Sequence, residues 1–436
     1  MAWPRSVPLA ALWSARPRSE TEARWTRWSI FAVPSTVLTR QAGEDALASV
    51  GEALAVPGMA SKQKRADEDA PPFCGGWIVT LSYELGTEIE PAARVSRTGE
   101  AASPWPRATM FRCGDAYIHD GWLDRWWVTG DAGALPPMRE VEGAVQPRPY
   151  SLELAQEEGR AEYVERVRRA IEYIRAGDIF QANIARSIRG RVQGSTRGLW
   201  GAMLAAAEPW YGAYLEWDGR AILSASPELF LRVDGDGRRV VTRPIKGTRP
   251  GDAGPRELRE CAKDRAELDM IIDLMRNDLG RVCEYGSVQV AEAFAIERHA
   301  RGRGGTGVLH GVATIGGRLK EGVDAGKLLA ATFPAGSITG APKVRAMQII
   351  DELEGSPRGP YTGSIGYFSD CGNACLNVAI RTAAIRGGEL SFGVGAGIVA
   401  DSDPQREWEE TVTKASVLAA AAEAAEASSR MEGVQP

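Results

Sequence analysis

From residue 151 onward, short strand-like segments joined by tight turns alternate with long helical segments. The segments 220–233 and 238–247 have strand composition and are joined by the turn DGDG. The segment that begins at Ala161 has apolar residues at helical spacing (Val164, Val167, Ile171 and Ile174) and is ended by the stop signal Gly177-Asp178. Hairpins produce antiparallel pairs, whereas a parallel sheet needs a crossover, commonly a helix, between successive strands. The pattern therefore predicts an α+β fold and argues against a doubly wound parallel sheet.

Composition divides the chain into three stretches. Residues 1–150 mix strand and helix patterns with two Gly- and Pro-rich connections, near 57–72 and 129–150. Residues 151–422 carry the regular pattern described above and, as shown below, all the candidate site residues. The Ala- and Glu-rich end, 423–436, is expected to be disordered.

Charge and cysteine content exclude several classes of protein. The net charge of −5 argues against nucleic-acid binding, which needs a concentrated basic surface. No apolar run is long enough to cross a membrane. The six cysteines have no disulfide-framework spacing, so we expect reduced thiols and a cytoplasmic protein. The pair in CGNAC (371–375) is interpreted as a hairpin turn and not as a metal site.

The segment RPIKGTRP (243–250) contains an unusual residue, Lys246. Only eight of the 52 basic residues of the chain are lysine, and the others are arginine. Arginine stays protonated in proteins, whereas a desolvated lysine can lose its proton and act as a nucleophile or a base. Lys246 is therefore a candidate catalytic residue.

Two helical segments each carry a pair of acidic residues on one face. Asp264 and Glu267 are three residues apart, as are Glu407 and Glu410. Two such pairs could hold Mg²⁺ without a complete protein cage. The alternative is two solvated helix faces with an ordinary pair between Glu410 and Lys414. Spacing by itself favours this alternative.

Two glycine-rich segments and one arginine are candidates for binding anions. FPAGSITGAPK (333–343) and GVGAGIV (393–399) could bring backbone amides close to a carboxylate, or could allow tight packing instead. Arg381 is the only charged residue in NVAIRTAAI, so it needs a carboxylate from the protein or from a substrate. His310 could orient a substrate or fill the core.

Seven motifs in sequence order resemble one family, the chorismate-utilising enzymes. They are SPELF, RPIKGT, KDRAELDMIIDLMRNDLGRV, TFPAGSITGAPKVRAMQIIDELE, GPYTGSIGYF, NVAIRT and GAGIVADSDPQREWEET. The resemblance covers about 150–420 strongly and GGWIVTLSYELG weakly. It implies a four-layer α/β/β/α fold with two orthogonally packed, largely antiparallel sheets.

The resemblance also implies roles for particular residues. Glu267 and Glu410 match Mg²⁺ ligands, with Asp264 and Glu407 close by, and Glu228 matches the general acid for the leaving C4 hydroxyl. The residues that match the chorismate pocket are Gly247, Thr248, His310, Tyr361, Arg381, Gly395 and Gly397. An insertion of about six residues separates Glu297 from His310, so His299 is a second candidate for the histidine near the ring.

Two positions separate the branches of the family. PIKGT resembles the aminodeoxychorismate synthases, in which the lysine (here Lys246) is thought to attack C2 of chorismate, whereas anthranilate synthases usually have PIAGT. Isochorismate and salicylate synthases have a lysine base where this chain has Gln181. The resemblance therefore implies component I of an aminodeoxychorismate synthase, on the route to 4-aminobenzoate for folate or a secondary metabolite.

Ammonia needs a source, because the sequence lacks the Gly-x-Cys-x-Gly nucleophile elbow of a glutamine amidotransferase. We therefore expect a separate glutaminase subunit as partner. An anthranilate synthase component I is the alternative enzyme. A non-catalytic homologue that binds chorismate or tryptophan is the alternative from another class.

Overall fold

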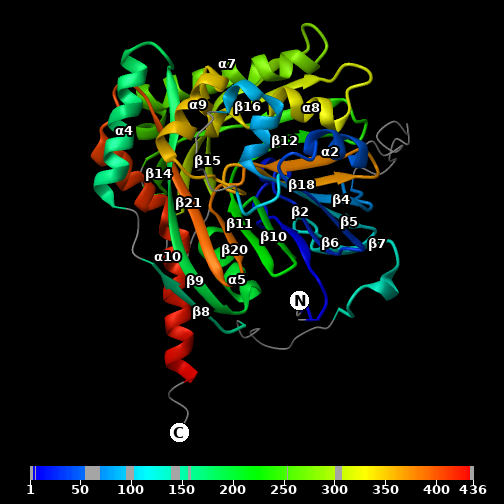
Figure 1. The fold of residues 1–436 in the computed structure, drawn as a ribbon. Coiled ribbons are helices and arrows are strands. Elements are labelled where there is room, and N and C mark those ends of the chain that lie inside the picture. The colour runs from blue at the N-terminus through cyan, green and yellow to red at the C-terminus, as the bar shows by residue number, and fades with distance from the viewer. Residues whose placement is uncertain are drawn as a thin grey trace.

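Two β-sheets and their covering helices make up the computed structural model, which describes residues 3–4, 6–54, 69–94, 103–138, 148–155, 159–252, 254–299 and 307–432. Every ladder between the described strands is antiparallel, and helices lie on the outer faces of the sheets (Figure 1). The predicted α+β class and the α/β/β/α arrangement of two antiparallel sheets are confirmed.

The first sheet has 11 strands within the described residues. It contains strands from the beginning, the middle and the end of the chain. In spatial order they are β17 (Gly340–Ala341), β9 (Gln181–Gly194), β21 (Glu389–Ile398), β20 (Thr382–Arg386), β11 (Arg220–Ser226), β10 (Tyr211–Trp217), β1 (Ala10–Trp13), β2 (Trp28–Val33), β6 (Asp115–Asp120) and β7 (Arg125–Thr129), with β8 (Tyr150–Leu154) paired to β9.

The second sheet has 10 strands within the described residues. Their order is β14 (Ile245–Pro250), β16 (Val308–Arg318), β13 (Arg239–Arg243), β12 (Leu229–Val233), β19 (Ala374–Asn377), β18 (Ser364–Ser369), β4 (Gly76–Leu81), β5 (Ala108–Cys113) and β3 (Thr36–Arg40), with β15 (Gln289–His299) paired to β16. The pairing of β4 with β18 joins the two sides of the predicted boundary at residue 150.

The main helices cover the two sheets. The helices α4 (Arg160–Arg175), α5 (Thr196–Ala207) and α10 (Pro404–Glu432) pack on the first sheet, together with α9 (Lys343–Glu354). The helices α2 (Ala46–Leu54), α6 (Pro255–Glu260), α7 (Ala262–Val282) and α8 (Ala325–Thr332) lie over the second sheet. Short helices complete the described structure: α1 (Glu20–Ala23), η2 (Tyr83–Leu85), α3 (Gly86–Ile89), η3 (Pro91–Ala93), η4 (Ala132–Ala134) and η5 (Gly336–Ile338).

The hydrophobic core between the sheets contains residues from both parts of the chain. Ile30 and Leu215 from the first sheet pack with Ile78, Phe111 and Ile365 from the second. All five side chains are almost completely buried. Removing this apolar surface from water stabilises the contact between the sheets. None of the helices in the described part of the chain is long and apolar enough to cross a membrane.

The structure differs from the sequence-based expectations at two helices. The sequence of 255–279 has one continuous helical pattern, which predicts a single helix, but the structure has two helices there, α6 and α7, with an extended residue, Cys261, between them. The stretch 423–436 was expected to be disordered, but α10 continues to Glu432. Alanine has the highest helix propensity, and Ala421 and Ala425 are buried against the neighbouring helix and sheet. Residues 433–436 lie outside the described residues, as do parts of the predicted connections 57–72, 129–150 and 299–307.

Candidate active site

The predicted catalytic and substrate-binding residues gather where the two sheets adjoin. Glu228 lies in the connection by which the chain passes from β11 of the first sheet to β12 of the second. Lys246 belongs to β14 of the second sheet, while Gln181 and Gly397 belong to β9 and β21 of the first. The α7 and α10 helices contribute the acidic residues.

Three predicted residues meet at Gly397. A β-carbon at this position would lie 2.8 Å from Lys246 Nζ and 2.8 Å from Gln181 Nε2, so glycine leaves room for both side chains. Gln181 is buried, and neither its amide oxygen nor its amide nitrogen has a hydrogen-bond partner among the described residues. Burying an unpaired amide costs free energy, so this side chain is ready to bind a polar ligand.

Gly247 forms a β-bulge between Lys246 and Thr248. The pairing of β14 with β16 shifts at this residue, which has a φ of +76°, in the region that favours glycine. A β-carbon at Gly247 would also lie 3.0 Å from Asp264 Cβ. The bulge places Thr248 opposite His310, and Thr248 Oγ1 is 3.0 Å from His310 Nδ1. The PIKGT segment therefore contains both the catalytic candidate Lys246 and the β-bulge that places Thr248 next to His310.

Both candidate histidines are buried next to each other. His310 and His299 contact each other edge to face, with ring centroids 5.0 Å apart, and His299 stacks on Trp210. Burial, then the charges of His299 and Arg381, hold the pKa of His310 well below its ordinary value. His310 Nε2 has no hydrogen-bond partner among the described residues, whereas His299 Nε2 lies 3.4 Å from Glu297 Oε2. His310 thus keeps a free nitrogen for a ligand, and His299 supports it from the side.

Glu228 has the properties of a general acid. Its carboxyl is buried, and Ser337 Oγ donates a hydrogen bond of 2.5 Å to Glu228 Oε1. Burial raises the pKa of Glu228 to about 7, although the hydrogen bond from Ser337 and the charge of Lys246 oppose this shift. A carboxyl with this pKa is partly protonated near neutral pH and can donate its proton.

Three of the predicted acidic ligands lie near one another. Lys263 Nζ is 3.8 Å from Glu267 Oε1 on α7 and 3.3 Å from Glu407 Oε1 on α10. The pKa of Glu267 is raised by burial first, and the negative charges of Glu407 and Glu410 raise it further. A cation is therefore favourable between the two helices, and Lys263 contributes one.

Asp264 and Glu410 each have a close basic partner of their own. Asp264 Oδ2 accepts a hydrogen bond of 2.8 Å from Arg249, and Glu410 Oε1 is 2.7 Å from Lys414 Nζ, as the surface-pair alternative predicted. The charge of Lys414 lowers the pKa of Glu410. Within the described part of the chain, no three acidic, histidine or cysteine side chains are grouped tightly enough to hold a metal ion by themselves. The donors fit Mg²⁺ bound through one or two carboxylates, with water and substrate oxygens completing its shell.

Arg381 is a partly buried cation that has no counter-ion among the described residues. Its guanidinium makes no ion pair or hydrogen bond with the described residues, and burial by itself lowers its pKa to about 10. It lies between β19 and β20 with a φ of +49°, not within a strand as its apolar neighbours suggested. A partly desolvated charge is stabilised by an anionic partner, so the alternative of a substrate carboxylate is favoured over a protein carboxylate.

The glycines of β21 serve different purposes. The Tyr361 ring packs directly on Gly393. A β-carbon at Gly395 would lie 2.8 Å from Ile184 O of β9, and Gly395 O accepts a hydrogen bond of 2.8 Å from Lys414. Gly395 is therefore explained by close packing of the strands, whereas Gly397 faces the candidate catalytic residues.

The other glycine-rich segment, FPAGSITGAPK, is also explained by packing. A β-carbon at Gly336 would lie 2.8 Å from Met275 Cε of α7, and one at Gly340 would collide with the backbone of Gln181. These glycines allow η5 and β17 to approach their neighbours and need no anion. Sequence reasoning missed the importance of Ser337, which this segment delivers to Glu228.

Two other residues of the site were not identified as candidates from the sequence. They are Lys263, and Lys414, which was considered only as a partner of Glu410. The chain has eight lysines, and three of them, Lys246, Lys263 and Lys414, lie at this site. The scarcity of lysine was a usable signal, because it applied to these positions as well as to Lys246.

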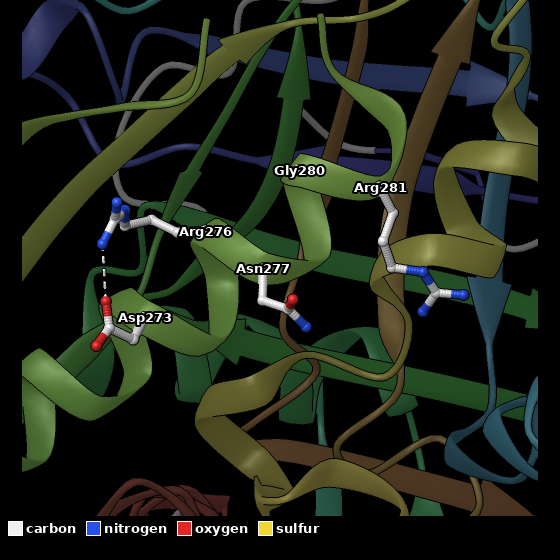
Figure 2. Close-up of a pocket in the computed structure, with 5 residues that line it drawn as sticks. All are labelled: Asp273, Arg276, Asn277, Gly280 and Arg281. Carbon is white, nitrogen blue, oxygen red and sulfur yellow. Dashed lines mark hydrogen bonds and ion pairs between the residues drawn. The ribbon is translucent and has the colours of Figure 1, made fainter. Parts of the chain in front are cut away.

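A separate surface pocket lies on the outward face of α7, away from these residues. Figure 2 shows its lining residues, which are Asp273, Arg276, Asn277, Gly280 and Arg281. The charged pair at its rim, Asp273 and Arg276, is already satisfied at 2.9 Å. None of the predicted site residues lines this pocket.

Comparison with known proteins identifies the family. The profile of the chorismate binding enzymes matches residues 11–420. The chain belongs to this family. The buried site with Lys246, Glu228 and the acidic residues of α7 and α10 thus lies in a chorismate-binding enzyme.

Curated relatives of this chorismate-binding enzyme carry two different names. It is 44% identical to anthranilate synthase component 1 1 of Haloarcula marismortui, over 81% of this chain and 77% of the relative. It is 44% identical to aminodeoxychorismate synthase component 1 of Escherichia coli, over 58% of this chain and 56% of the relative. It is 36% identical to the aminodeoxychorismate synthase of Streptomyces griseus, over 79% of this chain and 50% of the relative. Overall identity therefore does not choose between the two names.

Solved structures agree with the family assignment. Anthranilate synthase component I from Streptococcus pneumoniae superimposes with a TM-score of 0.74 at 29% identity, over 89% of this chain and 91% of that chain. The menaquinone-specific isochorismate synthase of Escherichia coli has the same fold, with a TM-score of 0.68 at 18% identity, over 95% of this chain and 89% of that chain.

Proposed function

We propose that this chorismate-binding enzyme is component I of an aminodeoxychorismate synthase, which converts chorismate and ammonia to 4-amino-4-deoxychorismate and water. The observation that carries the proposal is the position of Lys246. Its ammonium lies beside Gly397 and Gln181, and its charge acts on the Glu228, Glu267 and Glu410 carboxyls. The chain uses arginine almost everywhere else, so a lysine at this point supports a role that arginine cannot perform.

The proposed reaction has two substitutions. The neutral amine of Lys246 attacks C2 of chorismate while the ring double bonds shift, and the C4 hydroxyl leaves as water with the proton of Glu228. Ammonia then attacks C4, the double bonds shift back, and the Lys246 nitrogen leaves C2. Hydroxide is a poor leaving group, so the first substitution depends on a protonated acid. The buried Glu228 carboxyl supplies one near neutral pH.

Gln181 supports amination over hydration. A neutral amide cannot remove a proton from water, so this position offers no base for a hydrolytic reaction. Its unpaired oxygen and nitrogen, next to Lys246, are available to hold a polar substituent of the substrate.

Two cationic regions would hold the dianionic substrate. The Arg381 guanidinium has no counter-ion in the described part of the chain and suits one carboxylate. Glu267 and Glu410 would hold Mg²⁺, with Glu407 and Asp264 close by. When bound, Mg²⁺ offsets negative charge and helps to fix the ring carboxylate.

We further propose that a separate glutaminase subunit supplies the ammonia. Relatives named as component 1 support a second component. Ammonium salts should replace this subunit in solution. The product would serve 4-aminobenzoate synthesis, for folate or for a secondary metabolite.

The experiment is incubation with chorismate, Mg²⁺ and ammonium, with products identified by liquid chromatography and mass spectrometry. We expect 4-amino-4-deoxychorismate, which gives 4-aminobenzoate only after a lyase is added. Lys246→Ala should reduce its formation and release some anthranilate, whereas the exposed control Lys327→Ala should behave like the wild type. Anthranilate as the main wild-type product without a lyase would refute the proposal.

An anthranilate synthase component I is the second candidate. The 44% identity to the Haloarcula marismortui enzyme, over most of both chains, supports it. The same incubation separates the candidates, because anthranilate forms with release of pyruvate. A non-catalytic homologue would consume no chorismate, and the arrangement of Glu228, Lys246 and Glu267 in one site argues against it.

A further inference from the structure

A buried hydroxyl lies against the proposed acid. Ser337 Oγ is 2.5 Å from Glu228 Oε1, and the two residues are only 5% and 4% exposed. Water therefore has little access to this hydrogen bond. A charge-assisted hydrogen bond in such surroundings is stronger than the same bond in water.

The fold holds the Ser337 hydroxyl in a fixed place. Gly336, its neighbour in η5, lies directly against α7, where a β-carbon would be 2.5 Å from Leu274 Cδ2 and 2.8 Å from Met275 Cε. On the other side, Ile338 O accepts a hydrogen bond of 3.0 Å from the buried Arg358 guanidinium. The turn is thus in contact with its surroundings both before and after Ser337, and these contacts hold the hydroxyl beside Glu228.

We propose that Ser337 is a positioning residue for Glu228, whose hydroxyl fixes the orientation of the carboxyl and stabilises the carboxylate formed when the proton leaves. The inference rests on the proposed function only in that Glu228 protonates the departing C4 hydroxyl of chorismate. Both candidate reactions include this step.

The chemistry follows from the side on which Ser337 binds. Because Ser337 occupies Oε1, the proton of the neutral acid is carried on Oε2. This proton moves to the C4 hydroxyl oxygen, the carbon–oxygen bond breaks with its electron pair going to oxygen, and water leaves. The carboxylate that remains accepts the hydrogen bond from Ser337 at Oε1, so the developing negative charge meets a donor already in place.

Other groups also face Glu228 and favour its ionised form, so the loss of Ser337 should only partly reduce activity. Lys246 from β14 and Lys414 from α10 place positive charge nearby, and the backbone N–H of Ile245 donates to the carboxyl. Without Ser337, these groups still favour the ionised form, and Glu228 can still act as an acid. We therefore expect a weakened enzyme and not an inactive one.

The test compares three variants by the rate at which chorismate is consumed. Ser337→Ala should lower kcat about 10- to 100-fold, with little change in KM, and should shift the basic limb of the pH–rate profile to higher pH. Ser337→Thr keeps a hydroxyl and should restore most of the rate. Thr339→Val removes a buried hydroxyl of the same turn that bonds to Ala335 O, so the control should leave the position of the basic limb unchanged.

A double-variant comparison separates positioning from a structural role. In a Glu228→Gln background, Ser337→Ala should slow the residual reaction less than about 2-fold, because its effect acts through the carboxyl. An unchanged kcat in Ser337→Ala, an unmoved basic limb, or a full additional loss in the Glu228→Gln background would overturn the proposal. Anthranilate as the wild-type product would refute the proposed function and leave this test intact, since chorismate loss is measured in either case.

Discussion

The titration of Glu228 should set the upper pH limit of the reaction. Burial raises its pKa from the ordinary value of 4.5 to about 7. An ordinary glutamate is protonated in about 0.3% of molecules at pH 7, whereas Glu228 should be protonated in about half of them, an increase of about 150-fold. The acid acts in its protonated form, so ionisation of Glu228 should lower the rate about tenfold for each pH unit above about 7, whereas the need for a neutral Lys246 amine lowers the rate at low pH.

The measurement is kcat/KM for chorismate between about pH 5.5 and 9, since this parameter reports groups of the free enzyme. The concentration of free ammonia must be held constant, because ammonium itself loses its proton as the pH rises. Glu228→Gln removes the transferable proton and should lower kcat about 10²- to 10⁴-fold. Glu228→Asp keeps a carboxyl and should retain more activity.

Two results would refute this reasoning. A wild-type profile that stays flat to pH 9 would show that the group donating the proton has a much higher pKa than Glu228. A Glu228→Gln variant with nearly full activity would show that another residue protonates the leaving hydroxyl.

Three further predictions concern other parts of the site. Gly397→Ala should raise KM for chorismate in activity assays, because the added carbon meets the ends of the Lys246 and Gln181 side chains. The melting temperature should stay within about 2 °C of the wild type in thermal denaturation, since both side-chain ends can move aside. Glu354→Gln should lower the free energy of unfolding by about 3 to 5 kcal/mol in urea denaturation, because it leaves the buried Arg358 guanidinium without its counter-ion; a change below about 1 kcal/mol would contradict this. Glu407→Gln should weaken Mn²⁺ binding at least tenfold in calorimetry, and unchanged binding would exclude it as a ligand.

Much of the fold could be predicted because its signals are local. The helical spacing and the Gly177 stop predicted α4 closely, and the hairpin turns predicted the antiparallel strands around Glu228 and Lys246. The break at Cys261 could not be predicted, because Leu258 of α6 and Asp264 of α7 both pack against Gly247, which is distant in sequence. The predicted end of α10 was also wrong: the last residues were expected to be disordered, as chain ends commonly are, whereas the helix continues to Glu432.

The candidate site was predictable in its residues and unpredictable in its contacts. Lys246 stood out because lysine is rare in the chain, and the structure places it against Gln181 and Gly397. The missing counter-ion of Arg381 could be seen only in three dimensions, because any distant carboxylate could have satisfied it. Ser337 carried no signal, since a serine in a glycine-rich turn resembles any other loop serine.

The sequence by itself determined the secondary-structure class, the family resemblance and the rare lysine, because periodicity, motif order and composition are properties of the linear chain. Only the tertiary structure decided which polar groups at the site have no partner among the described residues, such as the Gln181 amide and the Arg381 guanidinium. It also decided that one glycine of β21 makes room for Lys246 while another serves strand packing. The physical reason is that burial, hydrogen bonding and charge depend on neighbours that the fold brings together from distant parts of the chain.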